Sequence, residues 1–91
     1  MKQLYTVYDV VAATIVGSII QESLDAPAIR AFHDALKAPQ SLLAQHPADY
    51  QLLLVGLIGY DGEITPAVPP KVIATGAAWA EQDNPPMRLE A

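Results

Sequence analysis

The sequence contains no cysteine and few charged residues. Without cysteine the chain cannot form a disulfide scaffold, a thiolate nucleophile or a cysteine-based zinc site. Only 16% of the residues are charged, whereas 52% are hydrophobic, which is too apolar for a disordered chain and too weakly charged for a well-solvated monomer. A chain of 91 residues forms one domain that buries only about 60–65% of its surface on folding. We therefore expect self-association.

Basic residues are scarce as well. Five Lys and Arg residues stand against ten Asp and Glu residues, so the net charge is −5. The basic residues are scattered along the chain: Lys2, Arg30, Lys37, Lys71 and Arg88. A strong sequence-independent DNA-binding protein makes roughly 6–10 phosphate contacts, so this composition disfavours a protein that coats DNA.

No hydrophobic run is long enough for a membrane span. The uncharged runs from Val10 to Ile20 and from Leu52 to Tyr60 both fall short of the roughly 20 apolar residues that a spanning helix needs. Asp9 precedes the first run and no cleavage site of small residues follows promptly, which does not fit a signal peptide. We expect a cytoplasmic protein.

The N-terminal third predicts two strands and a helix. Residues 3–8 alternate and are rich in β-formers, and residues 13–23 predict a weaker strand or an extended arm with a bend at Gly17. Residues 25–38 predict a helix in which Ile29, Phe32 and Leu36 share one face. Asp25 and Ser23 are the candidate N-caps of this helix.

The run from Leu52 to Tyr60 predicts a strand that is apolar on both faces. By strand alternation Leu53, Val55 and Leu57 point to the face that the helix does not cover, so we predict that these three residues form an interaction surface. Asp61 and Gly62 are typical of a tight type I′ hairpin turn after this strand.

The rest of the sequence predicts a returning strand over residues 63–68 and a final strand over residues 72–75, separated by prolines. The predicted fold is α+β, with one helix packed on a mostly antiparallel sheet of about four strands. Residues 1–78 are expected to form the domain, and residues 79–91 a polar C-terminal tail.

No arrangement typical of an enzyme is present. The sequence has no nucleophile elbow, phosphate loop or zinc-protease motif, and the spacing of His33 and His46 fits no metal site. We therefore expect no catalytic residue, metal or cofactor.

If the chain contacts nucleic acid, the candidate residues are Tyr5, Tyr8, Arg30 and Lys37. Because acidic residues surround the aromatic ones, packing is the favoured role of the tyrosines.

Four segments in succession resemble one viral protein family. They are "LYTVYD" (residues 4–9), "AIRAF" (28–32), "HPADYQLLLVGLIGYDGEITP" (46–66) and "PKVIATG" (70–76). Their order is similar to that in the small nonstructural protein of gokushovirus-type microviruses, the tailless single-stranded DNA bacteriophages. No single segment is specific, but their succession over residues 4–76 is.

The resemblance implies a role in viral DNA replication in the host cell cytoplasm. Members of this family are regarded as counterparts of microvirus protein C, which acts when synthesis switches from double-stranded to single-stranded genomes. The implied partners are viral or host replication proteins and further copies of the chain, with no membrane. Two alternatives stay open: a virion component that binds the capsid shell, and a weak single-stranded DNA-binding protein. Leu53, Val55 and Leu57 are more apolar than the family pattern, which favours a partner surface.

Overall fold

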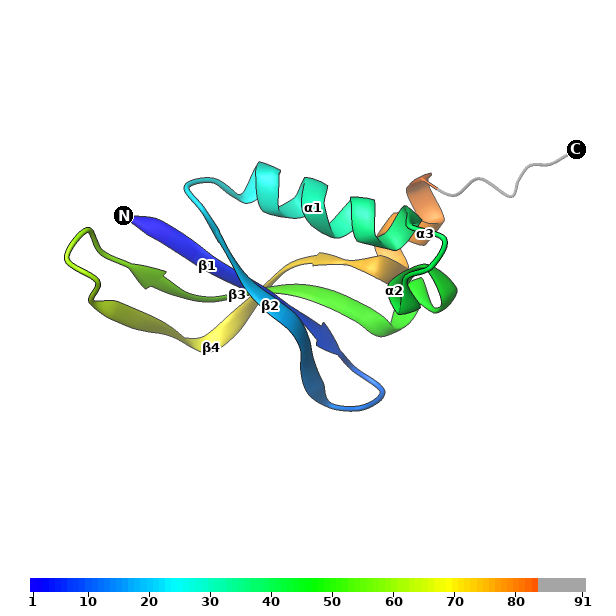
Figure 1. Ribbon diagram of the computed structural model, residues 1–91. Coiled ribbons are helices and arrows are strands. Elements are labelled where there is room, and N and C mark those ends of the chain that lie inside the picture. Colours follow the sequence, from blue (N-terminus) through cyan, green and yellow to red (C-terminus); the bar gives the residue numbers. More distant parts are fainter. Residues whose placement is uncertain (84–91) are drawn as a thin grey trace, which may run out of the picture.

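The computed structural model describes residues 1–83 and places four antiparallel strands in one sheet, in the order β2-β1-β3-β4 (Figure 1). The strands are β1 (Lys2–Asp9), β2 (Thr14–Glu22), β3 (Tyr50–Ile58) and β4 (Ile64–Thr75). The helices are α1 (Asp25–Lys37), α2 (Leu42–Gln45) and α3 (Gly76–Asp83), with a 3-10 turn η1 (Pro47–Asp49) before β3.

The predicted fold with a single helix was wrong. Within residues 1–83 the structure has three α-helices, and α3 begins directly after β4 in the region where a polar tail was expected to start. Trp79 explains the difference, because this side chain is buried in the core and only a helical turn after β4 brings it there. The rest of the predicted tail, residues 84–91, lies outside the described residues.

The two strands predicted after the hairpin are one strand. β4 continues through Pro66, Pro69 and Pro70 because it is an outer strand, where a missing backbone N–H need not break a ladder on both sides. Its register against β3 shifts between Leu54 and Gly56, so the proline-rich part bulges out of the ladder.

The two predicted N-terminal segments are both strands, and they form a hairpin. β1 pairs with β2, and the register shifts at Thr6, which lies opposite residues 17–19 of β2. Gly17 has φ +80° at this irregularity, a conformation that glycine adopts without steric cost. The predicted bend at Gly17 is therefore a β-bulge within a continuous strand.

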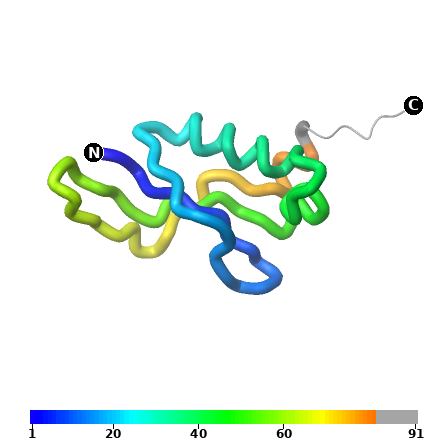
Figure 2. Tube along the Cα trace, in the orientation of Figure 1, coloured from blue at the N-terminus to red at the C-terminus, as the bar shows by residue number. Residues whose placement is uncertain are grey.

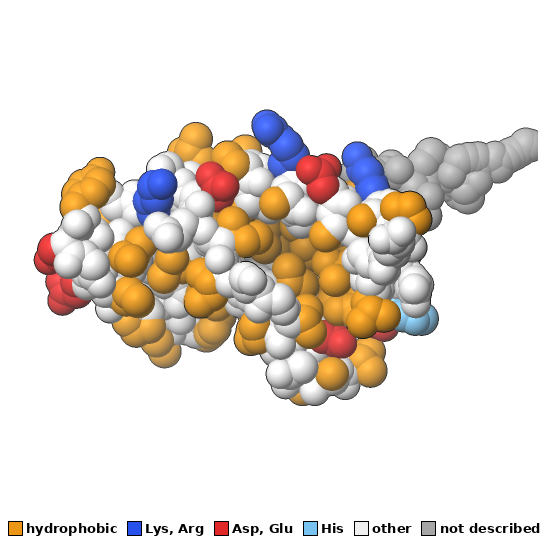
Figure 3. Space-filling model, in the orientation of Figure 1, with side chains coloured by type: hydrophobic (Ala, Val, Ile, Leu, Met, Phe, Trp, Pro, Cys, Tyr) orange, Lys and Arg blue, Asp and Glu red, His pale blue; other side chains and the backbone are white. Residues whose placement is uncertain are grey.

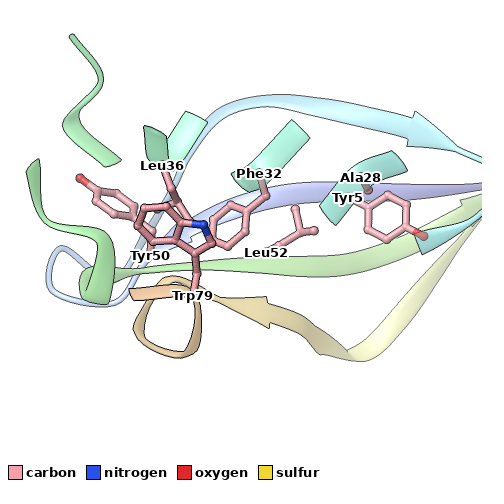
Figure 4. Close-up of a cluster of buried hydrophobic side chains, with 7 residues drawn as sticks. All are labelled: Tyr5, Ala28, Phe32, Leu36, Tyr50, Leu52 and Trp79. Atoms are coloured by element: carbon pink, nitrogen blue, oxygen red, sulfur yellow. The ribbon is translucent and has the colours of Figure 1, made fainter. Parts of the chain in front are cut away.

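The core lies between α1 and one face of the sheet. Phe32 and Leu36 point from α1 toward Leu52 on β3 and Trp79 on α3 (Figure 4). The rest of the buried cluster consists of Tyr5, Ala28 and Tyr50. Burial of each large side chain of this kind contributes about 1.5–3 kcal/mol. Because all three α-helices supply residues to this one cluster, the core is one-sided.

The start of α1 is fixed by a contact with the sheet rather than by a conventional cap. The N-cap residue is Leu24, which makes no side-chain cap, so the predicted caps were wrong. Instead the Tyr5 hydroxyl donates a hydrogen bond to the Asp25 carboxylate, and Gln3 Nε2 donates to the Tyr5 oxygen at 2.7 Å. This network ties β1 to the first turn of α1.

The β3–β4 turn differs from the predicted type I′ turn. Only Gly62 has positive φ (91°), whereas a type I′ turn requires it at both central residues. Gly59 N–H donates to the Glu63 carbonyl at 2.8 Å, and the Asp61 carboxylate accepts from Glu63 N–H at 3.1 Å. The loop is thus longer than two residues, and Asp61 stabilises it from inside.

The molecule is elongated because this hairpin projects beyond the helices (Figure 2). The principal-axis extents are 54 × 25 × 22 Å and the radius of gyration is 14.3 Å. A compact chain of this length has a radius of gyration of about 12 Å. We call residues 56–70, at the end opposite to α2 and α3, the distal hairpin.

A close backbone contact makes Gly76 a sensitive position. A Cβ atom added to Gly76 would lie 1.7 Å from the Pro47 carbonyl oxygen, so α3 could not keep its place against η1. We expect Gly76→Ala to lower the free energy of unfolding by about 3 kcal/mol. Gly62→Ala is the control, because its Cβ meets open space and only the positive φ costs about 1 kcal/mol. Chemical denaturation with equal losses for both variants would contradict this packing.

Tyr5 makes the fold sensitive to alkaline pH. Burial and the Asp25 carboxylate raise the pKa of Tyr5, and burial also raises the pKa of Tyr50. The folded state therefore holds these protons at a pH where the unfolded chain releases them, and stability falls as pH rises above the ordinary tyrosine pKa of about 10. Tyr5→Phe should weaken this alkaline loss while costing about 1 kcal/mol at neutral pH through the lost hydrogen bond.

Exposed Tyr60 provides the matched control, because Tyr60→Phe removes the same hydroxyl from a side chain that is almost fully exposed. Thermal unfolding followed by circular dichroism from neutral to alkaline pH measures both effects. The account fails if Tyr5→Phe and Tyr60→Phe have the same pH profile.

Candidate interaction surface

The sheet face opposite α1 carries no helix in the part of the chain that the structure describes. Residues paired across an antiparallel sheet share a face, so the face can be followed from the register. Tyr5 and Leu52 face α1, whereas Thr6 and Leu53 face away from it. We call the second side the helix-free face. Its side chains include Leu4, Thr6, Tyr8, Ile15, Leu53 and Val72.

Leu53 lies at the middle of the helix-free face. It pairs with Thr6 on one side and with Val72 on the other, and these neighbours leave it only 9% exposed. Val72, on the outer strand β4, is 47% exposed. A partner on this face would therefore contact Val72 more than Leu53.

The expectation that Leu53, Val55 and Leu57 share one face was wrong. The register between β1 and β3 shifts at Val55, which has no paired residue on β1 or β4. After this bulge Leu57 pairs with Gln3, whose side chain bonds Tyr5 and Asp25 on the helix side of the sheet. Leu53 and Leu57 therefore lie on opposite faces, because one extra residue reverses the alternation. Their part in binding stays a prediction.

The distal hairpin exposes three large apolar side chains. Tyr60 is 97% exposed at the tip and Val68 is 85% exposed on β4, with Ile64 between them in sequence and also exposed. Asp61 and Glu63 lie beside Tyr60 and Ile64. Figure 3 shows hydrophobic side chains spread over this hairpin, with acidic side chains at its tip. The hairpin is an arm that presents apolar residues next to carboxylates.

Sequence reasoning missed these residues. It singled out the most hydrophobic strand, but β3 lies inside the sheet and its neighbours cover it. Many exposed apolar side chains lie instead on the outer strands and the turns, among them Val11, Ile15, Ile19, Tyr60, Ile64, Val68 and Val72. The available signal was apolar residues within segments rich in proline or glycine, because such segments favour edges and turns.

The four candidate nucleic-acid residues do not come together. Tyr5 is fully buried between α1 and the sheet, which corrects its assignment as a base-stacking residue, because no part of the ring is accessible. Tyr8 pairs with Gln51 on the helix-free face. Arg30 and Lys37 are exposed on α1, on the other side of the molecule.

Acidic side chains interrupt the basic residues of α1. Asp34 follows Arg30 by four residues and precedes Lys37 by three, so the three side chains are neighbours on the outer surface of the helix. Figure 3 shows the basic side chains above α1 with an acidic one between them. This alternation of charge suits a solvated helix surface better than a phosphate-binding surface.

The described residues offer no other site chemistry. Within residues 1–83 no three His, Asp or Glu side chains gather as metal ligands. None of the helices in this range combines the length and the hydrophobicity that a membrane crossing requires. The chemically distinctive surface of the described chain is thus the apolar one on the helix-free face, the distal hairpin and β2.

Comparison with known proteins identifies the family of this chain. Neither a curated protein nor a solved structure matches this chain. The sequence profile of the family described as Phage ORF5 protein matches residues 2–79, which run from the start of β1 to Trp79 in α3. The match covers the whole sheet and the core. The chain therefore belongs to the Phage ORF5 protein family, a family of bacteriophage proteins.

Proposed function

We propose that this bacteriophage protein is a nonstructural protein of the gokushovirus type, which acts in viral DNA replication and regulates the switch to single-stranded genome synthesis. Its resemblance to the gokushovirus proteins over residues 4–76 supports the assignment, together with its membership of a phage family. The proposed location is the host cell cytoplasm, and the proposed action requires no catalysis by this chain.

The distal hairpin supports action through protein contacts. Large exposed apolar surfaces on small domains typically mark contact sites for other macromolecules. Tyr60 and Val68 are nearly fully exposed, and the hairpin extends beyond the helices, where a partner can reach both of its sides. Aromatic residues of this kind often dominate binding free energy.

The charges on the hairpin indicate the chemistry of the partner. Asp61 and Glu63 lie at the tip beside Tyr60 and Ile64. Lys2 lies further back on β1, where it pairs with Ile58 of β3. The two carboxylates therefore disfavour nucleic acid at the tip itself. A replication protein with an apolar cleft bordered by Lys or Arg would complement it.

Substitution of the hairpin should reduce single-stranded genome synthesis. Val68→Asp places a charge where an apolar contact is proposed, which should weaken the contact by about 2 kcal/mol, or roughly 30-fold in affinity. In infected cells we expect the ratio of single-stranded genomes to double-stranded replicative DNA to fall, as measured by quantitative hybridisation. Ala31→Asp adds the same charge at an exposed position of α1 and should leave the ratio unchanged.

The same infection distinguishes the capsid alternative. Mass spectrometry of purified particles measures how much of the protein is packaged. Stoichiometric packaging together with a normal DNA ratio in the Val68→Asp phage would overturn the replication role in favour of a virion component. A reduced ratio with no packaged protein would support it.

Direct binding of single-stranded DNA is expected to be absent. Tyr5 is buried, and Arg30 and Lys37 lie on the far side of the molecule from Tyr8, so the four candidate residues do not combine stacking with positive charge on one surface. Fluorescence anisotropy with a labelled oligonucleotide should give no saturable binding even at low salt, where phosphate contacts are strongest. Saturable binding that Arg30→Ala and Lys37→Ala abolish would contradict this prediction.

A further inference from the structure

The two outer strands of the sheet differ in how well they are protected. β2 and β4 are the outer strands, and each has one side without a neighbouring strand among residues 1–83. Natural sheets protect such edges with proline, charge or bulges, because unpaired backbone groups recruit other strands. β4 has Pro66, Pro69, Pro70 and Lys71 and a register break. Its edge is therefore protected.

β2 has little of this protection. From Thr14 to Gln21 it contains no proline and no charged residue. Ile15 and Ile19 are exposed on it, Ile19 to 60%. Its one protective feature is the bulge at residues 17–19, which have no partner on β1, and the halves on either side are in regular register with β1. β2 is thus the edge at which a further strand can be added.

The charge distribution indicates what that strand is. The chain carries a net charge of −5, so two copies repel each other wherever acidic side chains meet. The run from Val10 to Gln21 contains no charged residue, and Glu22 is the single charged residue of β2. A second copy can therefore approach along β2 without placing one carboxylate opposite another.

The register also fits a second copy. Val16 and Ile20 pack against the core on the helix side of the sheet, whereas Ile15 and Gln21 pair with residues of the helix-free face. Antiparallel self-pairing centred on Ser18 would place Val16 opposite Ile20, Ile15 opposite Gln21 and Thr14 opposite Glu22. Each of these three pairs then shares a face, as a sheet requires.

Two residues near the centre are complementary in size. In this register Ile19 lies opposite Gly17 of the second copy. Nothing lies within 4 Å of the position of a Cβ atom on Gly17, so the exposed Ile19 side chain has space to pack there. At the ends of the pair the Thr14 hydroxyl can donate a hydrogen bond to the Glu22 carboxylate.

We propose that two copies of this chain associate through β2, paired antiparallel about a two-fold axis at Ser18. The two sheets become one, and antiparallel pairing keeps both α1 helices on the same side of it. The helix-free faces of the two copies then form one continuous surface. This association does not depend on the proposed role in DNA synthesis.

A cysteine introduced at the axis tests the register directly. Opposed residues of an antiparallel pair have Cα atoms about 4.5–5.5 Å apart, which a disulfide can bridge. The chain has no cysteine of its own, so Ser18→Cys should give a cross-linked dimer under mild oxidation. Thr65→Cys, exposed on the other outer strand, is the matched control and should stay largely uncross-linked. Equal or preferred cross-linking at residue 65 would overturn the proposal.

Light scattering of the wild-type chain, which has no cysteine, measures the association itself. The wild-type chain should be a dimer, and Ile19→Lys should raise the dissociation constant at least roughly 30-fold, since it places two cations near the axis. Val68→Lys, at another exposed apolar position, should leave the dimer intact. A wild-type monomer at all concentrations, or a dimer that persists in folded Ile19→Lys, would overturn the proposal. Circular dichroism verifies folding of both variants.

Discussion

The packing of α1 on the central strands is the contact on which the rest of the structure depends. Phe32 and Leu36 bury against Leu52, and the hydrogen bond from Tyr5 to Asp25 fixes where the helix starts. A domain of this size has few other large side chains to bury. α2 and α3 extend the same cluster rather than building a second one. The apolar content of the chain therefore exceeds what its single core can cover.

This one-sided core explains where the interaction surfaces lie. Within residues 1–83 the helices leave one sheet face without a helix, and the distal hairpin extends past them. Acidic residues border the hairpin tip, and charges of both signs cover α1. Charged side chains thus mark the outer surface of α1, whereas exposed apolar side chains lie on the sheet side, on the outer strands and the distal hairpin. Contacts with proteins can form on the second side without disturbing the core.

The sequence predicted individual strands and helices better than it predicted how they are arranged in space. Strands β1 and β2, the body of α1 and the bend at Gly17 follow from periodicity and glycine placement. The fold prediction failed at α3, because Trp79 is identified as a core residue only by its distant contact with Phe32 and Leu36. The predicted surface failed at Val55, since alternation assumes an unbroken register and a bulge has no clear sequence signal. Exposed Ile19 and Val68 depend on strand order, which local patterns do not determine.

The prolines of β4 have a consequence for assembly. A sheet with two open edges can add a strand at each side and grow into an unlimited ribbon, the geometry of fibrils. Pro66, Pro69 and Pro70 leave this sheet with one edge that accepts a strand. When two copies pair along that edge, neither copy has an open edge left, so the sheet stops growing at the closed dimer. A chain this apolar can therefore assemble without polymerising.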